Sequence, residues 1–168
     1  AAVWVLGALS SGPLHLGRTT WRTTAKRPVI TGAATGLLVG GAFLVGGLVV
    51  RHIPVIAEPI TTVLEYTNHV PLVLIVLIAM VNGVAEELFF RGALYTALGR
   101  FYPVLISTVL YAAATFATGN PMLAFAGLIL GTVCGLQRRA TGGVLAPVLT
   151  HLVWGLIMVL ALPLVFGL

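Results

Sequence analysis

An all-α polytopic transmembrane helix bundle is the fold class that this sequence predicts. Hydrophobic residues make up 59% of the 168 residues and charged residues only 8%, and a water-soluble domain of this size could not bury so much apolar surface. The apolar residues form runs bounded by Gly, Pro and charged residues, and each run is near the length that a bilayer requires. The runs lack the period-two alternation of a closed β-barrel, which leaves the helical bundle.

The apolar runs predict full helices at residues 29–50, 71–98, 103–118, 122–137 and 144–161. A shorter run, from Ala1 to Leu9, cannot span a bilayer and predicts the tail of a helix that starts upstream. The polar segment 51–70 predicts an external loop with room for a short interfacial helix. We therefore divide the chain into a partial helix with a basic cytoplasmic loop, a packing helix with an external loop, and a core, at residues 1–28, 29–70 and 71–161.

The helix predicted at residues 29–50 carries Gly32, Gly36 and Gly40 at a four-residue spacing. Small residues at this spacing form a face on which a second helix can approach closely. We therefore predict that this helix has a packing role.

The basic residues predict how the bundle sits in the membrane, because loops that carry Lys and Arg are retained in the cytoplasm. Alternate threading of the helices puts these basic residues on one face: Arg18, Arg22, Lys26, Arg27, Arg91, Arg100, Arg138 and Arg139. Only Arg51 falls on the other face. We therefore expect residues 10–28, 99–102 and 138–143 in the cytoplasm, and residues 51–70, 119–121 and the C-terminus outside.

The net charge is +5, but the basic residues are scattered between apolar runs and form no continuous stripe. This pattern favours contact with lipid headgroups over binding of nucleic acid. We expect an integral protein of a bacterial plasma membrane, with the lipid bilayer as a partner and no nucleic acid. Cys134 is the single cysteine, so neither an internal disulfide nor a thiolate metal cluster can form.

One short motif predicts a functional site inside the membrane. Residues 82–91 read Asn-Gly-Val-Ala-Glu-Glu-Leu-Phe-Phe-Arg and end a long apolar stretch. Each ionised side chain at mid-membrane depth costs roughly 2.5–3.5 kcal/mol on an insertion scale, so three are not expected there without a use. The chain has no Asp, and its other acids, Glu58 and Glu65, lie in the external loop.

Helical geometry assigns different roles to the two glutamates of the motif. Glu87 and Arg91 are i,i+4 neighbours and can form an ion pair. Glu86 lies about 100° away around the helix, with Asn82 one turn before it as a supporting residue. Glu86 is therefore the candidate general base, able to take a proton from water and return it to an amine. The alternative is a structural ion network near the cytoplasmic interface.

His151 is the histidine that falls inside an apolar helix, and it is the candidate group to hold water or an oxyanion. At helical rise it lies roughly 10 Å from the cytoplasmic end and Glu86 roughly 18 Å, so the two could share a cavity. The alternative is a lone buried histidine bonded to a carbonyl. A metal site from His52 and His69 is conceivable, but histidines in loops are usually solvated.

The acidic motif and His151 resemble those of a family, the CAAX prenyl protease and bacteriocin-processing (CPBP) family of intramembrane glutamic endopeptidases. Glu86, Glu87 and Arg91 match its first motif, Glu-Glu-x-x-x-Arg, and Gly92 is the glycine that often follows. The stretch from 137 to 151 resembles the loop and helix that lead to the family's third-motif histidine, His151. The resemblance covers about residues 71–160. It implies an intramembrane endopeptidase that cuts a peptide or membrane-protein substrate with glutamate-activated water.

The resemblance implies no metal or other cofactor, and the residues agree. A catalytic zinc usually needs three protein ligands. If Glu86, Glu87 and His151 were those ligands, no spare group would remain to act as the base.

The chain departs from the family in two motifs. The second motif, Phe-x-x-x-His, has two stand-ins here, Tyr111-x-x-x-Thr115 and Phe116-x-x-x-Asn120. We favour Thr115 as the catalytic stand-in, because its estimated depth of roughly 18 Å matches that of Glu86.

Asn120 is the alternative position for the second motif. It precedes Pro121 and is expected to begin the next helix. The third motif, His-x-x-x-Asn or Asp, ends here in Gly155, which has no side chain to donate. A weakened or inactive enzyme is therefore one expectation. The alternatives are a non-catalytic scaffold or immunity-type relative and, third, a proton-coupled transporter that uses Glu86.

Overall fold

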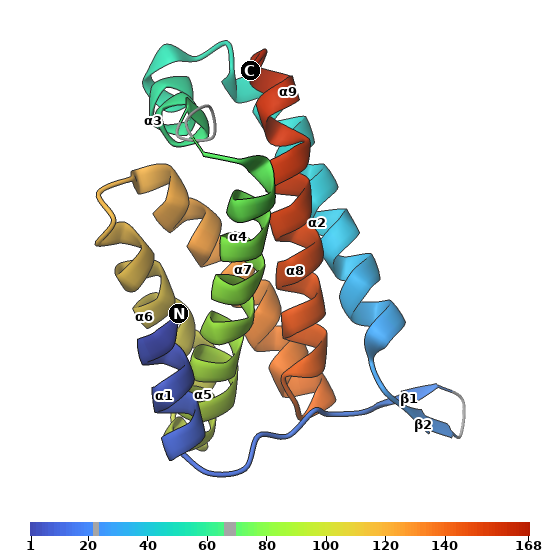
Figure 1. The fold of residues 1–168 in the computed structure, drawn as a ribbon. Helices are drawn as coiled ribbons and strands as arrows, with labels where there is room; N and C mark the ends of the chain where they lie inside the picture. The colour runs from blue at the N-terminus through green and yellow to red at the C-terminus, as the bar shows by residue number, and fades with distance from the viewer. Residues whose placement is uncertain (22–23, 66–69) are drawn as a thin grey trace.

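The computed structural model describes residues 1–21, 24–65 and 70–168, and in that part of the chain the helices form a bundle (Figure 1). This confirms the all-α polytopic fold. The longer helices are α2 (Val29–Val50), α4 (Leu72–Glu87), α6 (Pro103–Phe116), α7 (Pro121–Thr141) and α8 (Leu145–Leu160). Helix α4 continues through the π-helical segment η2 (Leu88–Leu94) into α5 (Tyr95–Leu98). The shorter helices are α1 (Ala2–Ser10), α3 (Pro54–Glu65) and α9 (Leu162–Phe166).

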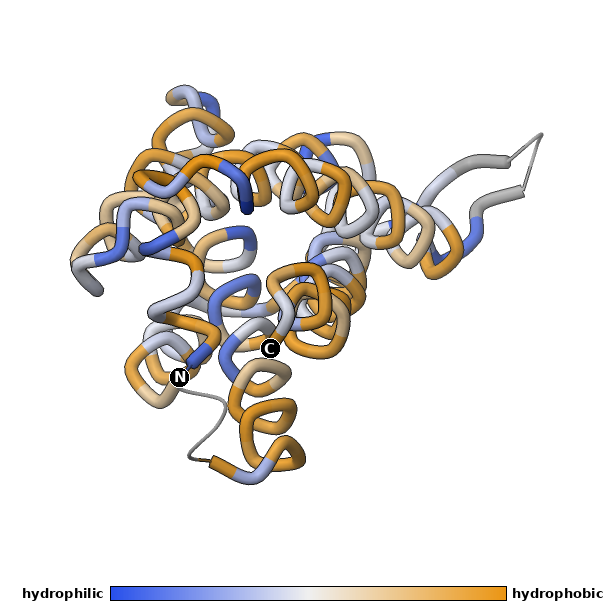
Figure 2. The backbone as a smooth tube through the Cα atoms, turned by 90° about the horizontal axis from the view of Figure 1, so that it is seen from above, coloured by the Kyte–Doolittle hydropathy of each residue, from blue (hydrophilic) through white to orange (hydrophobic). Residues whose placement is uncertain are grey.

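Within the described residues, four helical stretches are long and apolar enough to cross a membrane: Val29–Val50, Leu72–Leu98, Pro121–Thr141 and Leu145–Phe166. Figure 2 shows that hydrophobic residues occupy most of the long helices. Stretches of this length and composition are typical of an integral membrane protein. Helix α6 is shorter than the predicted 103–118, because the chain turns at Gly119, whose φ of +85° a helix cannot accommodate.

The basic connections lie at one end of the bundle, opposite α3 and the C-terminus (Figure 1). This end includes an antiparallel hairpin of β1 (Thr19–Trp21) and β2 (Thr24–Lys26), which we had not predicted in the loop 10–28. Its β-branched threonines favour extended backbone. We had counted Arg91 among the basic residues of the cytoplasmic face. This was wrong, because its side chain is fully buried inside the bundle and is not a loop charge. Arg22 and His69 lie outside the described residues.

Helix α2 packs through its predicted glycine face against α8, the helix that carries His151. A Cβ atom at Gly36 would lie 2.7 Å from Val153 Cβ and 2.8 Å from Thr150 O. The Thr150 hydroxyl also donates to Gly32 O, at 2.8 Å. The glycine face therefore sets the position of the helix that supplies the candidate histidine.

We expect Gly36→Ala to destabilise the bundle, because the added methyl group overlaps backbone and side chain of α8. Overpacking of this kind costs about 1–3 kcal/mol. Gly41→Ala, on the same helix, is the matched control, since a Cβ atom there meets nothing within 4 Å. Thermal unfolding of both variants in detergent tests the difference, and equal melting temperatures would contradict this packing.

The segment that follows α1 crosses the connection between α7 and α8. Val144 N donates to His15 O at 2.8 Å and Leu145 N donates to Leu16 O at 3.2 Å. These peptide groups begin α8, so the N-terminal segment satisfies donors that have no partner within that helix. At the crossing, Gly143 lies so close to Gly17 that a side chain could not be accommodated.

Candidate active site

The structure brings the predicted acidic motif and the predicted histidine together. Glu86 and Glu87 lie at the end of α4, Arg91 lies one turn later in η2, and His151 lies on α8. Helices α4 and α8 run side by side (Figure 1). Glu86, the candidate base, and His151 are far apart in the sequence but therefore lie in one site.

Glu87 is the centre of a buried charge cluster. Arg91 Nη1 donates to Glu87 Oε1 at 3.0 Å, and both side chains are fully buried, so the expected i,i+4 ion pair is present. His151 Nδ1 lies 2.9 Å from the same oxygen, a contact that we had not predicted. The Arg91 guanidinium also lies over the ring of Tyr111, 4.7 Å from its centroid. Glu87 therefore fixes both the arginine and the imidazole.

Glu86 has a different environment, because 19% of its side chain is exposed. Asn82 Nδ2 donates to Glu86 Oε1 at 3.4 Å, and the Tyr111 hydroxyl donates to Glu86 Oε2 at 2.9 Å. His151 Nε2 lies 3.9 Å from the same Oε2. This separation is too long for a direct hydrogen bond and is of the kind that a water molecule can bridge. Glu86 is thus the carboxylate that solvent or substrate can reach.

The pattern at residues 71–98 had led us to expect a regular helix. The helix that carries the motif is instead interrupted by a different helical form. Residues 88–94 form a π-helix, a rare form that is frequently found at functional sites. Side chains bind two carbonyls of this segment: Arg138 Nε donates to Arg91 O at 2.8 Å, and the Thr96 hydroxyl donates to Gly92 O at 2.6 Å. These bonds stabilise the wider turn that places Arg91 inside the bundle.

Close helix contacts around the cluster depend on two further glycines. A Cβ atom at Gly83 of α4 would lie 3.2 Å from His151 Cδ2. One at Gly131 of α7 would lie 3.1 Å from Arg91 Nη2 and 3.2 Å from Tyr111 Cδ1. Larger residues at either position would push the imidazole or the guanidinium away from the carboxylates.

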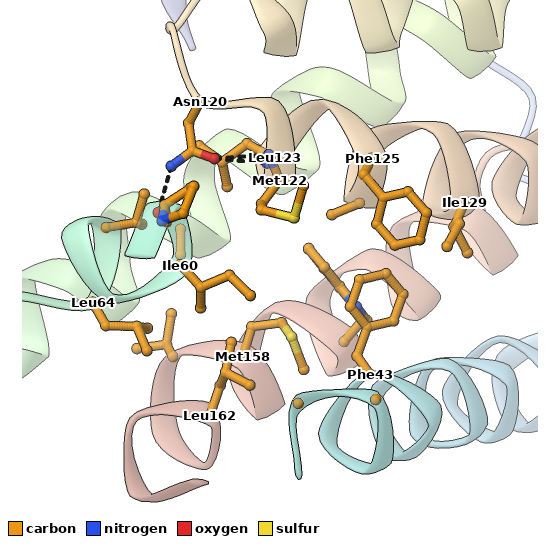
Figure 3. Close-up of a pocket in the computed structure, with 18 of the residues that line it drawn as sticks. Phe43, Ile60, Leu64, Asn120, Met122, Leu123, Phe125, Ile129, Met158 and Leu162 are labelled. Carbon is orange, nitrogen blue, oxygen red and sulfur yellow. Dashed lines mark hydrogen bonds between the residues drawn. The ribbon is translucent and has the colours of Figure 1, made fainter. Parts of the chain in front are cut away.

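The stand-ins for the second motif are placed differently from one another. The Thr115 hydroxyl donates to Tyr111 O at 2.7 Å, within its own helix. Asn120 begins α7, as expected: its Oδ1 accepts from Met122 N at 2.8 Å, and its Nδ2 donates to Pro59 O at 2.6 Å (Figure 3). A catalytic part for Thr115 or Asn120 stays a prediction.

Sequence reasoning did not assign a role to the Tyr111 side chain, although its hydroxyl reaches Glu86. The signal was a polar hydroxyl in an apolar helix, one turn before Thr115 and on the same face. Gly155, at the last position of the third motif, faces α4, where a Cβ atom would lie 3.4 Å from Met80 Cε. The family's donor therefore has no side-chain replacement at that position.

An apolar cavity of about 900 Å³ adjoins the site, between α2, α3, α4, α7 and α8 (Figure 3). Its volume lies in the range of sites that bind small ligands. Asn82 lines this cavity and also donates to Glu86, so one side chain connects the cavity to the candidate base. Trp154 lines it too, with its ring centroid 5.8 Å from that of His151.

The chain was compared with known protein families, curated proteins and solved structures. Residues 68–157 match the family described as type II CAAX prenyl endopeptidase, Rce1-like. No curated protein and no solved structure matches the chain. The matched region covers more than half of the 168 residues and contains α4, η2, α6, α7 and the His151 segment of α8. The chain therefore belongs to the family of Rce1-like type II CAAX prenyl endopeptidases.

Proposed function

We propose that this protein is an intramembrane endopeptidase that hydrolyses a peptide bond with glutamate-activated water. The observation that carries this proposal is the unequal environment of two adjacent glutamates. Glu87 is buried and bonded to Arg91 and His151, whereas Glu86 is partly exposed and faces His151 across a gap of 3.9 Å. One carboxylate holds the site and the other is left to react.

The contacts determine which ring nitrogen of His151 carries a proton. Glu87 Oε1 already accepts from Arg91, and an ionised carboxylate can only accept, so His151 Nδ1 must carry a proton and donate. In the neutral imidazole, Nε2 then presents a lone pair toward Glu86. A water molecule between Nε2 and Glu86 Oε2 can donate one hydrogen bond to each. Glu86 takes one of these protons as the water oxygen attacks the scissile carbonyl, and returns it to the leaving amine.

The cavity beside Asn82 indicates what kind of substrate the site would take. Its lining is apolar apart from a few groups such as the amides of Asn82 and Asn120. The apolar part of a peptide or membrane-protein substrate could bind there while its scissile bond reaches Glu86. We propose a substrate of the CAAX class and cleavage near the cytoplasmic side of a bacterial plasma membrane.

The test compares the membrane proteomes of cells that carry the wild-type protein or Glu86→Ala. Uncleaved membrane proteins or prenylated peptides should accumulate only with the variant. In parallel, the purified protein in lipid vesicles should cleave a prenylated CAAX peptide, and Glu86→Ala should not. No difference between the two proteins in either experiment would favour a non-catalytic relative.

The sidedness of the bundle is tested by cysteine labelling. Cys134 is fully buried and should remain unlabelled. We expect a cysteine at Arg139 to react with an impermeant reagent only after the cytoplasmic face is opened, and one at Glu58 to react from outside, because the basic loops should be cytoplasmic. Both side chains are exposed. The reverse labelling pattern would invert the proposed orientation.

We expect hydrolysis to be independent of bound zinc. Arg91 and His151 already bond to Glu87 Oε1, which leaves that oxygen poorly placed to bind a metal, and Glu86 is needed as the base. Chelation should leave turnover of the CAAX peptide unchanged. Loss of activity on chelation, restored by zinc at one equivalent per chain, would require a different mechanism.

A further inference from the structure

The hydroxyl of Tyr111 is the donor that lies on the reactive oxygen of the site. It is 2.9 Å from Glu86 Oε2, the oxygen that His151 Nε2 also faces. Tyr111 comes from α6, and its side chain is only 6% exposed. Its hydroxyl therefore lies where the water and the scissile carbonyl would meet.

Hydrolysis needs a donor for the negative charge that develops on the carbonyl oxygen. With Nδ1 donating to Glu87, the tautomer proposed above has a lone pair at Nε2, so it offers an acceptor and not a donor there. Arg91 is buried against Glu87, and the Thr115 hydroxyl is bonded to Tyr111 O. Gly155 has no side chain. The phenol of Tyr111 keeps its proton at neutral pH and is free to turn from Glu86 to the substrate.

We propose that Tyr111, at the first position of the stand-in Tyr111-x-x-x-Thr115, is the oxyanion donor of this chain; this rests on the proposed hydrolysis by Glu86. In the free site the hydroxyl donates to Glu86 Oε2. When Glu86 Oε2 takes the water proton, it becomes a neutral and weaker acceptor. The Tyr111 hydroxyl then donates instead to the scissile carbonyl oxygen.

The step balances without a further reactant. The water oxygen bonds to the carbonyl carbon, one water proton moves to Glu86, and the carbonyl π electrons move onto the oxygen that Tyr111 holds. The carbonyl then reforms, the C–N bond breaks with its electron pair on nitrogen, and nitrogen takes the proton from Glu86. The products are a carboxylic acid and an amine, and Tyr111 keeps its proton throughout.

Tyr111→Phe removes the donor and keeps the ring. The ring packs against Phe90, with centroids 5.1 Å apart, and under the Arg91 guanidinium, so the phenylalanine variant should fold. We expect kcat for a prenylated CAAX peptide to fall by about 10²–10³, with KM little changed, because an oxyanion donor acts mainly in the transition state. Tyr102→Phe is the matched control, since Tyr102 is 69% exposed outside the site, and it should keep wild-type kcat.

A second measurement separates an oxyanion donor from a structural role. A phosphinic analogue of the same peptide carries a tetrahedral, charged centre in place of the scissile carbonyl. Tyr111→Phe should weaken inhibition by this analogue by about the same factor as kcat, while inhibition by the cleaved product peptide stays unchanged.

Three outcomes would overturn the assignment. If Tyr111→Phe keeps the wild-type kcat while Glu86→Gln is inactive, Tyr111 is not the oxyanion donor, and the proposed hydrolysis by Glu86 is unaffected. A larger loss in Thr115→Val than in Tyr111→Phe would return the donor role to Thr115. Full turnover by Glu86→Gln would overturn the proposed function itself, and the assignment of Tyr111 with it.

Discussion

Replacing Glu86 by glutamine is expected to abolish peptide hydrolysis while the protein stays folded. Glutamine keeps the shape of the side chain, and its single oxygen can still accept from one of the two donors that contact the carboxylate, Tyr111 at 2.9 Å or Asn82 at 3.4 Å. It cannot take a proton from water. General-base catalysis contributes roughly 10²–10⁴ in rate, so turnover of a CAAX peptide in vesicles should fall by at least the lower figure.

The control for this variant is Glu58→Gln, which neutralises an exposed glutamate of α3 at the opposite end of the bundle from the basic loops. It should keep wild-type turnover. The melting temperature of Glu86→Gln in detergent should also stay near that of the wild type. Full turnover by a folded Glu86→Gln protein would show that another group activates the water.

Replacing Glu87 by glutamine is expected to have its main effect on folding. The change leaves the Arg91 charge without its counter-ion in a fully buried place and replaces the charged acceptor that orients His151 by a weaker, neutral one. Removing one partner of a buried ion pair typically costs about 3–5 kcal/mol. The folded yield after size-exclusion chromatography should therefore drop sharply, although the adjacent Glu86→Gln leaves it unchanged.

The double variant Glu87→Gln/Arg91→Met separates charge from shape. It removes both charges, so it should recover part of the yield that Glu87→Gln alone loses. A Glu87→Gln protein with wild-type yield and melting temperature would mean that Arg91 does not depend on this carboxylate.

Local spacing was enough to predict the ion pair and the helix packing. Glu87 and Arg91 are four residues apart, and that interval brings two side chains together on any helix. The glycine face of α2 was predictable for the same reason, since Gly32, Gly36 and Gly40 repeat on one face. In both cases the information lies within one or two turns of chain.

The position of Tyr111 was not predictable from spacing. The estimated depth along α6 favoured Thr115 as the residue beside Glu86. Depth alone, however, does not show which side chain of α6 is long enough to reach α4. Tyr111 lies one turn earlier on the same face, and its longer side chain reaches Glu86. The contact also depends on how α4 and α6 pack and on the π-helical turn at residues 88–94, which depends on a distant residue, Arg138.

The hydrogen bonds from Val144 and Leu145 to His15 and Leu16 have a consequence for biosynthesis. Residues 15 and 16 leave the ribosome before α8 does. The acceptors at residues 15 and 16 therefore have no partner at the start of α8 until that helix has been made. His151 lies two turns into that helix, so a nascent chain that stops before α8 has Glu86 and Glu87 but lacks the imidazole that contacts Glu87. Synthesis order alone thus delays assembly of this side-chain cluster until α8 has been made.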